Sequence, residues 1–476
     1  MYENLTMMTD LYQLTMMYGY HKKGLSKRRA VFYMFYRPAE GINYAVAAGM
    51  AQLREYILNL RFEEKDIAYL RSLGLFDESF LETLNNFRFT GSVDAVREGD
   101  FIFPGEPIVR VDAELSQAQL VETALLTLVG HQTLIATKAN RIVRAAQGDP
   151  VMEFGLRRAQ GPDAGTLGAR AAVIGGCGST SNVLTGQLFH VPVSGTHAHS
   201  WVMSFPSEIE AFRAYADCFP DKTLLLVDTY DTLRSGVPNA ITVFKEQRKK
   251  GFEPLGIRMD SGDLAYLSRQ ARKMLDEAGF PKARICASND LDEYLIRDLK
   301  LQGAKIDLWG VGTKLITSQG RAALGGVYKL CALEENGALQ PKIKLSDTLE
   351  KVTLPGKNDL YRLYDAQGMA VADLITQGDE EIDFSAPLTI FDPLEPWKRM
   401  TLDDYSARPM LTPLFVEGEA LPVEEDLAAL SAYRASQEET IWEEHLRPVN
   451  PHPFKVDLSD GLWNLRHSLM ENRLRH

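Results

Sequence analysis

Short apolar runs alternate with amphipathic stretches from about residue 150 to residue 313. Six runs have the length and composition of β-strands, and they are Val151–Gly155, His190–Ser194, Thr223–Thr229, Pro254–Ser261, Ala283–Asn289 and Asp307–Thr313. The stretches between the later runs predict helices at Val237–Lys250, Asp263–Ala278 and Leu291–Leu301. Strands that alternate with helices in this way are typical of a parallel sheet.

Each predicted strand ends in small or polar residues rather than in another aliphatic one. These ends are Phe154-Gly155, Ser194-Gly195-Thr196, Asp228-Thr229, Asp260-Ser261-Gly262-Asp263, Ser288-Asn289-Asp290 and Gly310-Val311-Gly312-Thr313. In a β/α barrel the reactive groups lie at the carboxyl ends of the strands, so one pocket would collect all of these segments. An open doubly wound sheet is the competing fold, but its usual GxGxxG turn follows none of the strands. We therefore predict an α/β protein with a β/α barrel over residues 138–330 that carries the active site.

The regions on either side of the predicted barrel have a different pattern. Residues 1–137 predict an N-terminal α/β domain, with a helix at Thr9–Tyr20, a strand at Ala30–Tyr36, helices to about Phe87 and then a β-rich piece. Residues 331–476 predict a C-terminal region that packs on the N-terminal domain. At its start, Gly326–Leu333 and Lys342–Ser346 flank Asn336-Gly337, which is a strong hairpin signal.

Composition and charge restrict the class of protein. The 476 residues are 45% hydrophobic and 24% charged, as in a folded domain, and a formal charge of -12 argues against nucleic acid as the main partner. The four cysteines lie far apart and lack CxxC spacing, which favours a reducing compartment. No stretch approaches the roughly 18 apolar residues that span a bilayer, and the N-terminus lacks a signal-peptide pattern. We expect a cytoplasmic protein without a membrane partner.

Two arginines, Arg157 and Arg158, follow the first predicted strand. A guanidinium is a planar fork of donors that suits a carboxylate or a phosphate, although a surface salt bridge is an equally good interpretation from these residues alone. The segment Gly195–Ser200 carries His197 and His199 after another strand. A zinc site would need further ligands, so each histidine is either a hydrogen-bonded structural residue or a nucleophile toward phosphate.

Two further strand ends carry candidate chemistry. Asp260 and Asp263 can hold Mg²⁺ through water or bind ribose hydroxyls, but an aspartate at the start of a helix is also favoured as a simple cap. Gly310–Lys314 resembles a small phosphate cradle, because its glycines let backbone amides approach an anion. A tight turn is the plainer interpretation of a short GxGT segment. Its place after the last predicted strand favours the phosphate.

Taken together, these segments resemble the nicotinate phosphoribosyltransferase family from residue 9 to about residue 330. The motifs that carry the resemblance are Thr9–Met16, Glu153–Arg158, Gly195–Ser200, Gly256–Asp263, Trp309–Thr317 and Gly325–Leu330. The resemblance implies a type II phosphoribosyltransferase, with an irregular β/α barrel beside a smaller α/β domain built from the N-terminal and C-terminal regions. It also implies a homodimer.

The resemblance implies the reaction as well. Nicotinate and 5-phosphoribosyl 1-pyrophosphate would give nicotinate mononucleotide and pyrophosphate, as the first step of NAD salvage from nicotinate. Hydrolysis of ATP would be coupled to the transfer, Mg²⁺ would be the metal cofactor, and His199 would be the phosphorylated residue.

The same resemblance implies a role for particular residues. Tyr12 would border nicotinate, Thr196 and Arg258 would contact it, and Arg157 would lie on the anionic substrates. The remaining substrate-binding residues would be Phe154, Ser261 and Gly262, with Gly310, Gly312, Thr313 and Thr317 at the ribose 5-phosphate. His199, Asp260 and Asp263 would be catalytic, and the two aspartates would be the metal ligands.

Three alternatives stay open at the level of sequence. The pyridine substrate could be nicotinamide or quinolinate, although an uncharged amide matches an arginine-rich pocket poorly. A barrel lyase could use Lys138 or Lys314 as a Schiff base. A third alternative is a non-catalytic binder of NAD precursors.

Overall fold

The computed structural model describes residues 4–38, 43–346 and 352–474. The chain divides into two compact units, Met1–Leu134 with Ala323–His476, and Ile135–Ala322. We call them unit 1 and unit 2. Among the described residues, no helix combines the length and the apolarity that crossing a bilayer requires.

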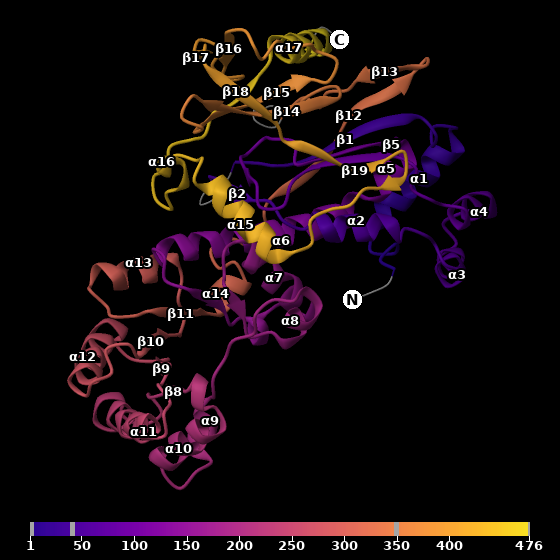
Figure 1. The fold of residues 1–476 in the computed structure, drawn as a ribbon. Coiled ribbons are helices and arrows are strands. Elements are labelled where there is room, and N and C mark those ends of the chain that lie inside the picture. The colour runs from indigo at the N-terminus through magenta and orange to yellow at the C-terminus, as the bar shows by residue number, and fades with distance from the viewer. Residues whose placement is uncertain (1–3, 39–42, 347–351, 475–476) are drawn as a thin grey trace. The chain divides into compact units, whose positions relative to one another are not determined.

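Unit 2 is built on a parallel sheet with the order β7-β6-β11-β10-β9-β8. The strands are β6 (Val151–Glu153), β7 (Ser179–Thr180), β8 (Leu224–Leu226), β9 (Gly256–Met259), β10 (Arg284–Ala287) and β11 (Leu308–Val311). Their side chains are almost all buried, because helices cover the sheet. Figure 1 shows α11, α12 and α13 beside these strands, in the magenta to salmon part of the chain.

The helices of unit 2 follow the predicted pattern closely. They are α7 (Pro162–Ile174), α8 (Val183–Phe189), α9 (His199–Met203), α10 (Glu208–Cys218), α11 (Val237–Lys249), α12 (Leu264–Glu277), α13 (Glu293–Leu301) and α14 (Thr313–Ile316), with short turns η1 (Leu156–Arg158), η2 (Pro220–Lys222) and η3 (Thr232–Gly236). Aspartate side chains cap α12 and α13: Asp263 accepts the Tyr266 amide and Asp292 accepts the Leu295 amide.

One predicted strand of unit 2 was wrong. His190–Ser194 forms only a single bridge, between Val193 and Thr180, because Pro192 inside the run has no amide hydrogen to donate. The neighbouring strand β7, which the sequence did not reveal, has only two residues. Among the described residues β7 and β8 are therefore the edges of an open half-barrel, and the sheet does not close.

Unit 1 contains a seven-stranded sheet with the order β13-β12-β1-β5-β3-β19-β20. Its strands are β1 (Arg29–Tyr36), β3 (Ser92–Val96), β5 (Val109–Glu114), β12 (Gly326–Glu335), β13 (Ala338–Pro341), β19 (Leu411–Val416) and β20 (Glu419–Ala420), and β2 (Ala45–Val46) pairs with β4 (Phe101–Ile102). Strand β1 is buried on both faces. Phe32 and Met34 belong to the main core, whereas Val31 and Tyr33 pack on the other side.

A second sheet of unit 1 has the order β17-β16-β21-β15-β14-β18. It consists of β14 (Asn358–Asp365), β15 (Ala370–Gln377), β16 (Leu388–Phe391), β17 (Arg399–Leu402), β18 (Tyr405–Pro409) and β21 (Val456–Leu458). The helices are α1 (Leu11–Lys22), α2 (Met50–Leu58), α3 (Glu64–Ser72), α4 (Glu78–Asn85), α5 (Leu115–Leu120), α15 (Leu427–Glu438), α16 (Glu443–Leu446) and α17 (Asp460–Leu474), while α6 (Glu122–Ala145) begins in unit 1 and ends in unit 2. In Figure 1 the second sheet lies on one face of the first, and α1 and α2 lie on the opposite face.

The hairpin predicted at Asn336-Gly337 is confirmed, and its second strand is corrected. Both turn residues have positive φ, 54° and 78°, as a two-residue turn between twisted strands requires. The strand that pairs with β12 is Ala338–Pro341, directly after the turn, and not Lys342–Ser346. A two-residue turn leaves no room for a longer connection.

Candidate functional site

The carboxyl ends of β8, β9 and β10 meet in one hydrogen-bonded network. The buried carboxylate of Asp228, after β8, accepts the Asp260 amide at 2.8 Å and the Ser261 hydroxyl at 2.6 Å through Oδ2. Oδ1 of Asp260, after β9, accepts the Ser288 hydroxyl and Nη2 of Arg258, the latter at 3.1 Å. Ser288, after β10, also accepts Nε of Arg258 at 2.8 Å. Parallel strands place these side chains at a single edge of the sheet.

The guanidinium of Arg258 is fixed beside an aromatic ring. Its Nε and Nη2 are held by Ser288 and Asp260, and its Cζ lies 5.7 Å from the centre of the Phe154 ring. Gly310 on β11 makes this placement possible, because a Cβ there would lie 2.8 Å from two atoms of the Phe154 ring. A Cβ on Gly312 would lie 3.0 Å from the Phe154 carbonyl oxygen. The result is a cation next to a planar apolar surface at the edge that carries the polar network.

His199 lies at the start of α9 and is partly exposed. Its Nδ1 is 3.1 Å from the Thr229 hydroxyl, and its Nε2 is 4.0 Å from Oδ1 of Asp228. That Asp228 oxygen is buried and has no hydrogen-bond partner among the described residues. The imidazole therefore has a hydroxyl on one nitrogen and a carboxylate near the other, as an activated histidine requires.

His197 occupies a different environment from His199. Its ring is buried against Tyr215, with ring centres 4.7 Å apart, and its Nε2 accepts the Leu226 amide. Burial lowers the pKa of His197 to about 4, so the ring is neutral at physiological pH. Thr196 Oγ1 donates to the Leu224 carbonyl at 3.0 Å. These two contacts attach the His199 segment to β8.

The other predicted site residues of unit 2 have simpler surroundings. Arg157 is exposed in η1, and Thr317 donates to the Thr313 carbonyl at 2.7 Å around the short helix α14. Asp263 is exposed and caps α12. Gly262, with φ of 81°, forms the left-handed turn that leads into the cap.

The predicted Mg²⁺ ligands were tested against the geometry. Among the described residues, no group of three or more His, Cys, Asp or Glu side chains could hold a metal ion alone. Mg²⁺ usually binds through one or two carboxylates together with waters and substrate phosphates. Asp260 fits that role, because Arg258 and Ser288 occupy only its Oδ1. Asp263 offers one oxygen besides the one that caps α12.

The lysines of the lyase alternative are both engaged. Nζ of Lys138 lies 2.7 Å from Glu293 and donates to the Gln319 carbonyl, and Nζ of Lys314 lies 2.7 Å from Asp292. A Schiff-base lysine needs a neutral amine in a site that lowers its charge. Neither carboxylate-paired lysine provides one.

The sequence analysis missed three residues of this network. Asp228, Thr229 and Ser288 were recognised as strand ends but were not selected as site residues. The available signal was their position directly after β8 and β10. Tyr12 lies in unit 1, where its side chain is exposed on α1, and its role stays a prediction.

Three family profiles match the chain. Residues 7–130 match the nicotinate phosphoribosyltransferase N-terminal domain, residues 150–379 the nicotinate phosphoribosyltransferase family, and residues 357–466 the nicotinate phosphoribosyltransferase C-terminal domain. The nicotinate phosphoribosyltransferase of Bacillus subtilis is 45% identical over 465 residues, which are 97% of this chain and 94% of that protein.

Solved structures support the same conclusion. The crystal structure of human nicotinic acid phosphoribosyltransferase has a TM-score of 0.85 and 30% identity, covering 97% of this chain and 99% of that one. The nicotinate-nucleotide pyrophosphorylase of Pyrococcus furiosus, at 19% identity and a TM-score of 0.70, shares the fold and covers 91% and 95%. The predicted irregular barrel with a smaller α/β domain is thereby confirmed. The chain belongs to the nicotinate phosphoribosyltransferase family.

Proposed function

We propose that this chain transfers the phosphoribosyl group of 5-phosphoribosyl 1-pyrophosphate to nicotinate, giving nicotinate mononucleotide and pyrophosphate as the first step of NAD salvage from nicotinate. The observation that carries the proposal is Arg258, held by Ser288 and Asp260 beside the Phe154 ring. Its Nη1 is left to bind a carboxylate, and the ring offers a surface for a pyridine. The names of the relatives point to the same substrate.

The transfer needs positioning more than proton transfer. The pyridine nitrogen of nicotinate carries a free lone pair at neutral pH, which attacks the anomeric carbon as the bond to pyrophosphate breaks. Arg258 and Phe154 would orient the ring for this attack. Thr196, Ser261, Gly262 and Arg157 would complete the substrate contacts, with Gly310, Gly312, Thr313 and Thr317 at the 5-phosphate.

Asp260 and Asp263 would hold Mg²⁺ through one oxygen each. When bound, Mg²⁺ supplies positive charge that stabilises the leaving pyrophosphate. Through Oδ1, Asp260 also restrains Arg258 and Ser288. Its substitution would therefore disturb the binding of both substrates.

We assign the coupling of ATP hydrolysis to His199. The carboxylate of Asp228 favours a proton on the ring nitrogen that faces it, so the lone pair lies on the other nitrogen. That nitrogen would form a bond to the γ-phosphorus of ATP while the bond to the ADP oxygen breaks. Phosphohistidine would later lose its phosphoryl group to water.

The proposal includes a homodimer in the cytoplasm. Two helices expose apolar side chains, Leu11, Tyr12 and Met16 on α1 and Val183, Leu184 and Leu188 on α8. Exposed apolar groups of this kind favour association. Tyr12 from one chain would then border nicotinate bound by its partner, and light scattering after size-exclusion chromatography measures the predicted mass.

The function is tested by product formation from labelled nicotinate, nicotinamide and quinolinate, each with 5-phosphoribosyl 1-pyrophosphate and Mg²⁺, with and without ATP. Mononucleotide from nicotinate, accelerated by ATP, is the expected result. Product from nicotinamide or quinolinate alone would assign a different pyridine substrate. Binding of nicotinate without any product would identify the chain as a non-catalytic binder.

The role of His199 is tested by His199→Ala. Because the side chain is partly exposed, we expect the variant to fold and to lose the acceleration by ATP. His197→Gln is the matched control, since it changes the neighbouring histidine. ATP stimulation that survives in His199→Ala would remove His199 from the proposed coupling.

A further inference from the structure

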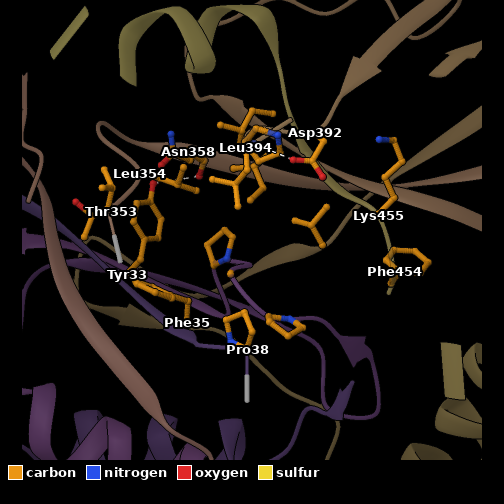
Figure 2. Close-up of a pocket in the computed structure, with 18 of the residues that line it drawn as sticks. Tyr33, Phe35, Pro38, Thr353, Leu354, Asn358, Asp392, Leu394, Phe454 and Lys455 are labelled. Carbon is orange, nitrogen blue, oxygen red and sulfur yellow. Dashed lines mark hydrogen bonds between the residues drawn. The ribbon is translucent and has the colours of Figure 1, made fainter. Parts of the chain in front are cut away.

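Unit 1 encloses a cavity of about 730 Å³ that contains none of the candidate site residues. It lies between β1 of the first sheet and β14, β15 and β21 of the second. Figure 2 shows Tyr33 and Leu354 at one end and Phe454 and Lys455 at the other. Small-molecule sites typically have volumes of about 300 to 1,000 Å³, so the size fits a ligand of several rings.

The aromatic wall at one end is fixed by hydrogen bonds. The Tyr33 hydroxyl donates to the Asn358 carbonyl oxygen at 3.2 Å and accepts the Asn358 amide. Burial raises the pKa of Tyr33, so its hydroxyl stays neutral. Since these bonds occupy the hydroxyl, the ring presents its apolar face to the cavity.

The aromatic wall at the other end is fixed by stacking. Phe454 stacks on Phe103 with ring centres 3.9 Å apart. Arg362 lies over both rings, at 5.3 Å from Phe103 and 5.7 Å from Phe454, and is held by two hydrogen bonds to Asp373. Arg362 and Asp373 are fully buried, so this support is rigid. A wall held in this way does not have to rearrange when a ring packs on it.

The remaining wall resists collapse for a reason of sequence. Six of the lining residues are prolines, Pro38, Pro104, Pro107, Pro393, Pro451 and Pro453. Proline fixes φ and has no amide hydrogen, so these segments are stiff and add few donors to the surface. Apolar lining without donors favours an apolar ligand.

Charged groups are concentrated at the Lys455 end of the cavity. Nζ of Lys455 pairs with Asp457 at 2.7 Å, and Asp392 lies on the same side, as Figure 2 shows. Burial raises the pKa of Asp457 to about 6. Both signs of charge are present there, so the end is polar without a strong preference for one sign.

We propose that this cavity binds a small planar molecule of two or three rings, mostly apolar and without net charge. The rings would pack between Tyr33 and Phe454, and a polar substituent would face Lys455 and Asp392. The site is separate from the transfer reaction and does not depend on the proposed function. It gives the C-terminal region, which supplies most of the cavity wall, a ligand of its own.

The probe is N-phenyl-1-naphthylamine, a neutral three-ring molecule whose fluorescence rises in apolar surroundings. We expect saturable binding with one probe per chain. Val456→Trp and Leu354→Trp should each weaken binding by about tenfold or more, because an indole would fill space that the probe needs. The matched control is Val416→Trp on β19, where the exposed valine does not line the cavity, and its affinity should match that of the unmodified chain.

Circular dichroism and cooperative unfolding establish that each variant is folded. Equal affinity in a folded Val456→Trp or Leu354→Trp variant would overturn the proposal, as would a lack of saturable binding to the unmodified chain. A second measurement needs no variant: 1-azidonaphthalene is photolysed with the unmodified chain and the labelled peptides are identified by mass spectrometry. Labels within residues 352–375 or 451–466 support the site, and labels found only elsewhere refute it.

Discussion

Replacing Asp228 by asparagine tests the proposed activation of His199. Asparagine keeps the shape of the side chain, but the carboxylate charge 4.0 Å from Nε2 of His199 is lost. Two unit charges at that distance interact by about 4 kcal/mol at an effective dielectric constant of 20. The His199 side chain is 40% exposed, so solvent screening reduces the effect to about 1 to 2 kcal/mol. We therefore expect ATP stimulation to fall by about five- to thirtyfold.

The assay measures nicotinate mononucleotide with and without ATP, together with the amount of phosphohistidine on the protein. Asp231→Asn is the matched control, because Asp231 lies three residues away and accepts the Leu233 and Arg234 amides without facing His199. It should leave ATP stimulation unchanged. Normal phosphohistidine and normal ATP stimulation in Asp228→Asn would refute the assigned role.

Two further predictions concern His197 and Gly310. Because the folded pKa of His197 is depressed to about 4, the unfolded chain binds the extra proton between about pH 6.5 and 4, and stability is lost as pH falls through that window. His197→Gln should therefore lose about 2 kcal/mol less than the unmodified chain between pH 7 and pH 5 in urea titrations, and equal losses would contradict the buried neutral ring. Gly310→Ala should displace the Phe154 ring, 2.8 Å from the new Cβ, and raise the nicotinate KM by about three- to tenfold, as steady-state kinetics would measure. Gly130→Ala, where a Cβ meets nothing within 4 Å, should leave the KM unchanged, and an unchanged KM in both variants would exclude Phe154 from the nicotinate site.

The periodic pattern predicted most of unit 2, because its long helices and buried strands are determined locally. The prediction of Asp263–Ala278 differs from α12 by one residue at each end. It failed at His190–Ser194, where composition indicated a strand but Pro192 interrupts the ladder. The order of the strands in unit 1 depends on pairings between distant segments, such as β1 with β12, which no local pattern encodes.

The candidate site was predictable in outline but not in its connections. Parallel strands bring their carboxyl ends to one edge, so the sequence alone indicated which segments meet. It did not indicate that Asp228 accepts the Asp260 amide, because that contact depends on backbone geometry at two strand ends. The two histidines also needed the structure, since only burial against Tyr215 distinguishes His197 from His199.

The polar network supplies a physical route from ATP use to nicotinate binding. Asp228 faces His199 through Oδ1 and holds the Asp260 amide through Oδ2, and Asp260 in turn restrains Arg258. A phosphoryl group on His199 would repel the Asp228 carboxylate and alter this restraint. We therefore expect Arg258→Ala to raise the nicotinate KM, whereas an unaltered KM would exclude Arg258 from the pocket.

The route itself is tested by a double-mutant cycle of Asp228→Asn and Arg258→Ala, measured on kcat/KM for nicotinate in the presence of ATP. Side chains that share the partner Asp260 should couple by about 0.5 kcal/mol or more, because the first substitution already disturbs what the second removes. In the absence of ATP, where His199 carries no phosphoryl group, the coupling should be smaller. Additive effects within about 0.3 kcal/mol under both conditions would mean that the network is structural and that ATP acts on nicotinate binding by another route.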